Sequence, residues 1–232
     1  MKLLTVDTST SWCGLALSDD GTIIAETQVN LGRRLAADIV GQIDALLASV
    51  GLRPAELDGF GIAMGPGSFT GLRIGAATVK GLALATGKPV AGFSSLAMLA
   101  MNLSHAAHQV CPLFDARKQE VYAGLYRCGE QPDPLIDDCV MPPERFIERL
   151  TSPTLFVGEG AVRYRALIEE RLGANALFAP AYLNHPRAAA GAHLAHTAFS
   201  RGESIPLPLL SPRYLRSSEA ETARQNALRT IA

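Results

Sequence analysis

Two aspartates that end apolar strand-like runs are the residues best placed to do chemistry in this chain. Asp7 is followed directly by the hydroxyl residues Thr8 and Ser9, and Asp115 ends a second such run later in the chain. Hydroxyl groups beside a carboxylate can contact a phosphate, so Asp7, Thr8 and Ser9 are the candidate phosphate-binding residues. The alternative is that turn amides satisfy Asp7, as they commonly do for short polar side chains.

The turn Gly65-Pro66-Gly67-Ser68 is the second candidate, because a glycine-rich loop that opens a helix can bind an anion through its free amides and the helix dipole. The Gly-Lys-Ser/Thr ending of a nucleotide-binding P-loop is absent, since Gly71-Leu72-Arg73 follows. Small residues then recur at helical spacing. They favour a structural role, in which Ser68 caps a helix that packs closely against another backbone.

The histidines and cysteines show no metal or nucleophile signature. His105 and His108, and likewise His193 and His196, have the spacing of neighbours on a helix, but no third acidic or thiol ligand lies close in sequence. The four cysteines form no Cys-x-x-Cys pair, and there is no Gly-x-Ser-x-Gly elbow. We therefore predict no catalytic residue, no metal site and no cofactor.

Composition narrows the class of protein. The chain has 232 residues and a formal net charge of -1, so it lacks the basic field that binding nucleic acid alone would require. We find neither a signal-peptide pattern nor an apolar stretch long enough to span a bilayer. Scattered cysteines suit a reducing compartment. These features predict a cytoplasmic protein without membrane contact.

The first half of the chain alternates between strand and helix patterns. Strands are expected at 3–7, 12–17, 22–29, 57–64 and 89–93, and helices at 35–50 and 68–86. An Asp-Gly pair marks a hairpin between the second and third strands. Three strands in a meander followed by helix, strand, helix and strand predict a mixed five-stranded sheet with helices packed on it.

The same pattern begins again at residue 110. The sequence VCPLFD at 110–115 repeats an apolar strand that ends in aspartate, and each copy is followed by a strand that contains a glycine, Gly14 or Gly124. Such internal repetition predicts two lobes of similar topology. We expect a first lobe at 1–103, a second, degenerate lobe at 104–205, and a segment at 206–232 that returns toward the first lobe.

Four ordered motifs carry a family resemblance: LLTVDTSTSWCGLAL at 3–17, GPGSFTGLRIG at 65–75, SSLAMLA at 94–100 and DARKQEVYAGLY at 115–126. Together with PRYLR at 212–216 they closely resemble the TsaB family of bacterial tRNA threonylcarbamoyladenosine biosynthesis proteins. The resemblance implies an α/β fold of the two-lobed actin-like ATPase (ribonuclease H-like) type. Each lobe would be a mixed five-stranded sheet flanked by helices.

Compared with actin-like ATPases, this sequence lacks several nucleotide-binding features. There, both strand-end aspartates lie near the phosphates and a glycine-rich turn follows each one. Here the turn at 115–118 has no glycine, and Glu159 stands in the loop that would face adenosine, where its carboxylate disfavours a phosphate. The catalytic relative TsaD holds a metal through two helix histidines, whereas the corresponding stretch Arg33–Ile39 has none.

The resemblance therefore implies a non-catalytic scaffold or activator that binds TsaD and acts with the ATPase TsaE. The complex would transfer threonylcarbamoyl from threonylcarbamoyl-AMP to N6 of adenosine 37 in tRNAs that read codons starting with A. This subunit would meet tRNA through the complex. Two alternatives stay open: an independent actin-like small-molecule kinase or ATPase, and a glycoprotease-like hydrolase, which the lack of metal ligands disfavours.

We expect the partner to contact the first two helices, whose apolar and small faces are wider than one sheet requires. The expected contact residues are Leu35, Ile39, Val40, Ile43, Gly71, Gly75, Thr78 and Leu82. Packing in the protein's own core is the alternative for each of them. An exposed apolar surface of this kind also predicts a homodimer when TsaD is absent.

Overall fold

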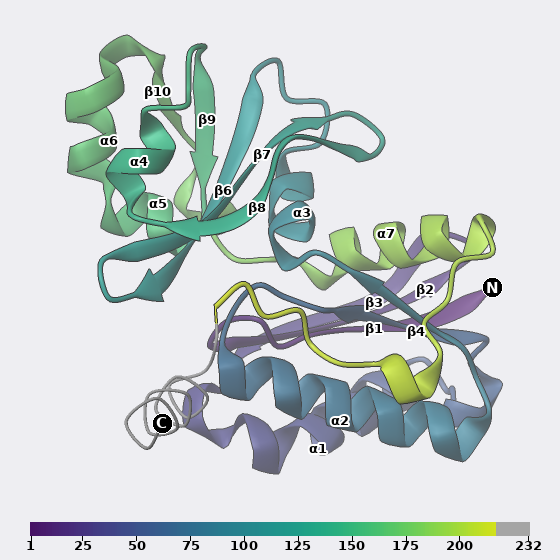
Figure 1. Cartoon of the computed structure of the whole chain (residues 1–232). Helices are drawn as coiled ribbons and strands as arrows, with labels where there is room; N and C mark the ends of the chain where they lie inside the picture. The colour runs from purple at the N-terminus through teal and green to yellow at the C-terminus, as the bar shows by residue number, and fades with distance from the viewer. Residues whose placement is uncertain (217–232) are drawn as a thin grey trace, which may run out of the picture.

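Each of the two lobes is built on a mixed five-stranded sheet (Figure 1). The computed structural model describes residues 1–216. The first sheet has the order β3-β2-β1-β4-β5 and consists of β1 (Lys2–Asp7), β2 (Trp12–Asp19), β3 (Thr22–Asn30), β4 (Gly59–Ala63) and β5 (Val90–Phe93). The meander β1-β2-β3 is antiparallel, whereas β4 and β5 join in parallel.

The second sheet repeats this plan with β6 in the place of β1. It consists of β6 (Gln109–Arg117), β7 (Glu120–Cys128), β8 (Pro132–Met141), β9 (Thr154–Val157) and β10 (Ala176–Phe178), in the order β10-β9-β6-β7-β8. The meander β6-β7-β8 is again antiparallel, and β9 and β10 again join in parallel. The predicted duplication of an actin-like lobe is confirmed.

Helices cover the outer face of each sheet (Figure 1). On the first sheet these are α1 (Leu35–Ser49) and α2 (Phe69–Thr86); on the second they are α4 (Pro143–Ile147), α5 (Glu159–Arg163) and α6 (Arg165–Leu172). Short 3-10 turns complete the connections at η1 (Gly32–Arg34), η2 (Pro54–Glu56), η3 (Met101–Leu103), η4 (Gly173–Asn175), η5 (Ala181–Leu183) and η6 (Leu207–Leu209).

The two inner helices are exchanged between the lobes. Helix α3 (Ser95–Ala100) follows β5 of the first sheet but packs on β6 and β7, and α7 (Ala188–Ser200) follows β10 of the second sheet but packs on β1, β2 and β4. The chain thus returns to the first lobe at α7, earlier than the expected boundary at 205. Small side chains permit this approach: a Cβ placed on Gly61 of β4 would lie only 2.7 Å from Ala195 Cβ.

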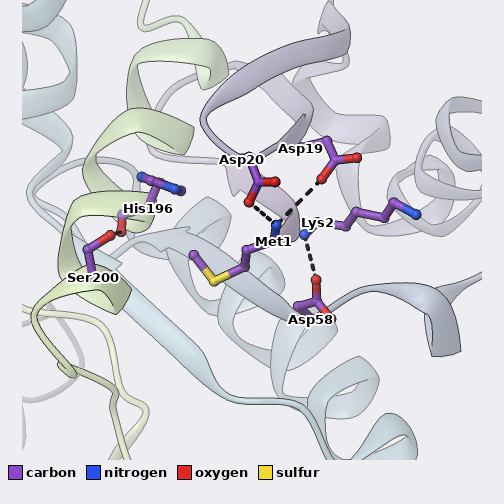
Figure 2. Close-up of polar contacts among 7 residues, drawn as sticks. All are labelled: Met1, Lys2, Asp19, Asp20, Asp58, His196 and Ser200. Carbon is purple, nitrogen blue, oxygen red and sulfur yellow. Dashed lines mark hydrogen bonds and ion pairs between the residues drawn. The ribbon is translucent and has the colours of Figure 1, made fainter.

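The start of β1 lies where several segments meet (Figure 2). The Met1 amino group contacts both Asp20 and Asp19, with 3.5 Å to Asp19, and the Lys2 amide donates to Asp58 Oδ2 at 2.7 Å. Figure 2 shows His196 of α7 on the same side of the Met1 side chain as Asp20. These contacts join β1, the β2–β3 turn and the segment before β4 next to α7.

After α7 the chain continues along the first lobe, as the prediction for the segment that begins at residue 206 requires. The Ile205 amide donates to Val90 O at 2.8 Å, and the Arg213 amide donates to Met64 O at 2.7 Å. The segment therefore runs beside β5 and then reaches the end of β4. Residues 205 and 213 thus contact the first lobe, and residues 217–232 of the expected segment lie outside the described residues.

The small residues of α2 serve a contact inside the chain. Ser68 caps the helix by accepting from the Gly71 amide at 3.2 Å, as predicted. A Cβ on Gly71 would lie 2.1 Å from Thr8 O, and one on Gly75 would lie 2.3 Å from Thr8 Oγ1. The two glycines thus make room for Thr8 in the turn after β1. We had expected them to make room for a partner helix, and the structure differs in this respect.

Replacing Gly75 by alanine should therefore destabilise the isolated protein by about 1–3 kcal/mol, because the new methyl group overpacks the α2–Thr8 contact. Thr8 cannot turn away without loss, since its hydroxyl donates to Gly71 O at 2.8 Å. Gly81→Ala is the matched control in the same helix, because a Cβ there meets nothing within 4 Å. It should raise the melting temperature slightly through helix propensity. Equal melting temperatures for the two variants would contradict the internal contact.

Candidate functional site

The predicted phosphate-binding turn after β1 is closed by the chain itself. Asp7, Thr8 and Ser9 have exposed fractions of 1%, 2% and 1%. Asp7 Oδ1 accepts from the Ser9 amide at 2.9 Å, which satisfies one of the two carboxylate oxygens within the turn. The Ser68 amide donates to Ser9 O at 2.6 Å, so the Gly65–Ser68 turn packs against this turn at Ser9.

Two polar atoms of this turn are left unsatisfied within residues 1–216: Asp7 Oδ2 and Ser9 Oγ are buried and have no hydrogen-bond partner there. The loss of solvation on burial raises the pKa of Asp7 to about 6, because the charged form is disfavoured away from water. The Asp7 side chain lies on the α7 side of the first sheet, because a Cβ on the neighbouring Gly14 would lie 3.6 Å from Asp7 Cβ and 3.4 Å from Ala188 Cβ. The arrangement favours the structural interpretation of Asp7.

Asp115 occupies the corresponding position in the second lobe. Its Oδ1 accepts a hydrogen bond from the Arg117 amide at 3.0 Å. Asp7 likewise accepts from the amide two residues later in the chain. Its Oδ2 contacts Arg163 at 3.1 Å and Arg117 at 3.7 Å. Arginines of the chain thus occupy the position at which a cation and its phosphate would be held.

The loop that would face adenosine is also occupied. The Gly158 amide donates to Asn184 Oδ1 at 2.8 Å, and a Cβ on Gly160 would lie 2.9 Å from Leu113 Cβ, so the two glycines serve contacts inside the chain. Burial and the nearby charge of Asp115 raise the pKa of Glu159. Glu159 thus adds a carboxylate to this loop.

The histidine pairs lie apart from any set of metal ligands. His105 and His108 lie in a loop and not on a helix, whereas His193 and His196 lie on α7. His193 Nε2 lies 2.6 Å from Glu130 O. Within the described residues no three His, Cys, Asp or Glu side chains are grouped to hold a metal ion. Nor is any helix there both long and apolar enough to cross a membrane.

A cavity of about 620 Å³ between the lobes was not expected from the sequence. It lies between η3, the β7–β8 turn and the start of α7, and its volume is in the range of small-molecule sites. Some of its polar groups are already engaged, whereas the buried Asn102 Oδ1 has no hydrogen-bond partner within residues 1–216. Arg187 pairs with Glu26, and Asn102 Nδ2 donates to Leu183 O at 2.9 Å and His185 O at 2.8 Å.

The expected partner residues separate into two groups. Five are buried in the first lobe: Leu35, Ile39 and Ile43, with exposed fractions of 6%, 1% and 3%, and the glycines Gly71 and Gly75. The side chains of the first three pack in the core between α1, α2 and the first sheet. Their apolar character is explained by that core, so the structure gives these five an internal role in place of the expected partner contact.

The other three remain accessible. Val40 is 63% exposed on α1, and Thr78 and Leu82 are half-buried on α2. The structure adds Leu84 of α2, which is 76% exposed and was missed because it lies outside the small-residue pattern. We call the two exposed aliphatic side chains, Val40 and Leu84, the outer helix face; Leu82 also packs against the core of the first lobe. Both helices cover the side of the first sheet that points away from the second lobe (Figure 1).

Comparison with known protein families and structures agrees with this geometry. Residues 29–224 match the family described as TsaD, tRNA N6-adenosine threonylcarbamoyltransferase. A tRNA threonylcarbamoyladenosine biosynthesis protein TsaB of Bacillus subtilis is 33% identical over 95% of this chain and 96% of the relative. The TsaB protein of Escherichia coli is 29% identical over 95% of this chain and 96% of its own length.

Solved structures give the same result. YeaZ from Pseudomonas aeruginosa superposes with a TM-score of 0.79 and 32% identity over 92% of this chain and 99% of that one. Component A of the (R)-2-hydroxyglutaryl-CoA dehydratase of Acidaminococcus fermentans, at a TM-score of 0.52 and 13% identity over 86% of this chain and 99% of that one, shares the fold alone. From its match to full-length relatives and from its duplicated lobes, the chain belongs to the TsaB family of tRNA threonylcarbamoyladenosine biosynthesis proteins.

Proposed function

We propose that this protein is a non-catalytic subunit in tRNA threonylcarbamoyladenosine biosynthesis. Relatives that match the whole chain are named for this pathway, and the family match to TsaD suggests a TsaD-containing complex as the place of action. The observation that carries the non-catalytic role is the Asp7 turn, which is buried and packs at Ser9 against the Gly65–Ser68 turn. A subunit that used this turn for phosphate chemistry would need it open.

In this proposal TsaD catalyses the transfer of threonylcarbamoyl from threonylcarbamoyl-AMP to N6 of adenosine 37, and TsaE supplies ATPase activity. The present protein is cytoplasmic, binds TsaD and supports that transfer. It meets tRNA through the complex. The near-zero net charge supports indirect contact, because tRNA binding by this subunit alone calls for a basic surface.

The outer helix face is the proposed contact with TsaD. Val40 and Leu84 are large aliphatic side chains that protrude from the helices, and such residues gain most from burial against a partner. Two copies of the same face can pair when TsaD is absent. The homodimer and the TsaD complex should therefore compete for one surface.

Val40→Glu and Leu84→Glu should each weaken TsaD binding by at least about tenfold, because an unpaired carboxylate would be buried in an apolar contact. Val162→Glu is a matched control, because Val162 is 61% exposed but lies on α5 of the second lobe. Titration calorimetry with purified TsaD measures affinity, and light scattering of the protein alone measures dimerisation. Equal binding by the Val40 and Val162 variants would place the contact elsewhere.

The isolated protein should release no phosphate from ATP above the level of a protein-free control and should cleave no peptide. The reason is that Asp7 is covered and Asp115 is held by two arginines. A malachite-green assay on protein purified without TsaD and TsaE tests the first point. Steady phosphate release that Asp7→Ala abolishes would overturn the proposal in favour of an independent actin-like kinase or ATPase.

Asp7 should also make folding stability depend on pH. Folding raises its pKa from 3.8 to about 6, so the folded state holds the proton more tightly than the unfolded chain does. This stabilising contribution is complete below about pH 4, is lost as the pH rises to about 6, and stays lost above that. Asp7→Asn removes the titration but keeps an oxygen for the Ser9 amide.

The unfolding free energy of Asp7→Asn relative to the unmodified protein should therefore rise by up to about 3 kcal/mol between about pH 4 and pH 7. Urea unfolding at several pH values measures this difference. Asp44→Asn, at an exposed position of α1, is the control for exchanging a carboxylate for an amide. A constant difference for Asp7→Asn would mean that Asp7 is hydrated and ordinary.

A further inference from the structure

Residues 212–216, the PRYLR motif, lie against both lobes. On the first lobe, the Tyr214 ring stacks on Phe69 of α2 with 4.1 Å between ring centroids and 12° between planes. Arg73 Nε donates to the Tyr214 hydroxyl at 2.9 Å, and the Arg73 guanidinium lies 4.4 Å from the Phe69 ring centroid. With the hydrogen bond from the Arg213 amide to Met64 O, these contacts fix the segment to α2 and to the end of β4.

The end of the same segment reaches the second lobe. Arg216 NH1 forms an ion pair of 2.9 Å with Glu120 Oε2 of β7, and both side chains are only about a third exposed. Leu215 packs against the apolar cluster that contains Phe114 of β6 and Tyr122 of β7. Four consecutive residues, 213–216, thus bind first one lobe and then the other.

The main chain itself crosses between the lobes at two places, from β5 into α3 and from β10 into α7. Two covalent crossings leave one axis about which two rigid bodies can rotate. Contacts between the lobes away from this axis determine whether the lobes rotate. One such contact is the β7–β8 turn on α7, where Gln131 Nε2 donates to Thr197 Oγ1 at 2.9 Å.

A second such contact is made by the 212–216 segment. Figure 1 shows it running past the N-terminal end of α2 toward the lower end of the second sheet, whereas the β7–β8 turn lies on the opposite side, above α7. We propose that residues 212–216 are a clasp that holds the two lobes at one angle, and that release of the clasp lets the lobes rotate. The clasp also ties helix α2 to the second lobe, so the orientation of that lobe is set by the helix that carries Thr78, Leu82 and Leu84.

The test measures the distance between lobes in the full chain. Spin labels at Ala45→Cys on α1 and Ala174→Cys in η4 report that distance by double electron–electron resonance, because both positions are exposed. Cys139→Ser removes the one native thiol within residues 1–216 that is not fully buried. The clasp variants are Tyr214→Ala and Arg216→Glu, and the repair variant combines Arg216→Glu with Glu120→Arg.

We expect a single narrow distance distribution for the labelled protein and one about twofold wider, or shifted, for each clasp variant, as hinge rotation requires. The charge-swapped double variant should restore the narrow distribution, which a general loss of stability would not do. Arg127→Glu is the control, since it breaks an ion pair with Asp133 that lies wholly within the second lobe. Unchanged distributions in the clasp variants, or no restoration in the double variant, would overturn the proposal.

Discussion

The packing of α7 on the inner face of the first sheet is the contact on which the rest of the structure depends. It brings the chain back from the second lobe and sets the first lobe against α3, so that each sheet is covered by a helix that follows the other sheet. Glu26 of β3 secures the start of α7, accepting from the Ala189 amide and from Arg187 Nε, each at 3.1 Å. A carboxylate at a helix N-terminus is favoured by the helix dipole.

This exchange makes the lobes interdependent without making them one body. Two main-chain crossings and a small number of polar contacts join them, and the 212–216 segment supplies some of the contacts farthest from the crossings. Because the inner helices are shared, neither lobe has a complete core alone.

The Asp7 turn combines the residue types of a phosphate-binding turn with packing contacts inside the chain. The strand-end aspartate and its hydroxyl neighbours remain, but Thr8 is bound to the backbone of α2 and Ser9 to the Gly65–Ser68 turn. A buried carboxylate with a raised pKa is often a sign of catalysis. Here the cause is desolvation in the absence of a charged partner within the described residues.

Much of the architecture could be predicted from the sequence alone. Alternation of strand and helix patterns located the elements, the repeated strand ending in aspartate revealed the duplication, and Ser68 marked the start of α2. The sequence did not decide which surface covers each apolar or small residue. Helical periodicity places Ile39 and Gly75 on a face, but core and partner select the same residue types, so only tertiary packing identified Thr8 as the neighbour of Gly75 and the first sheet as the site of α7.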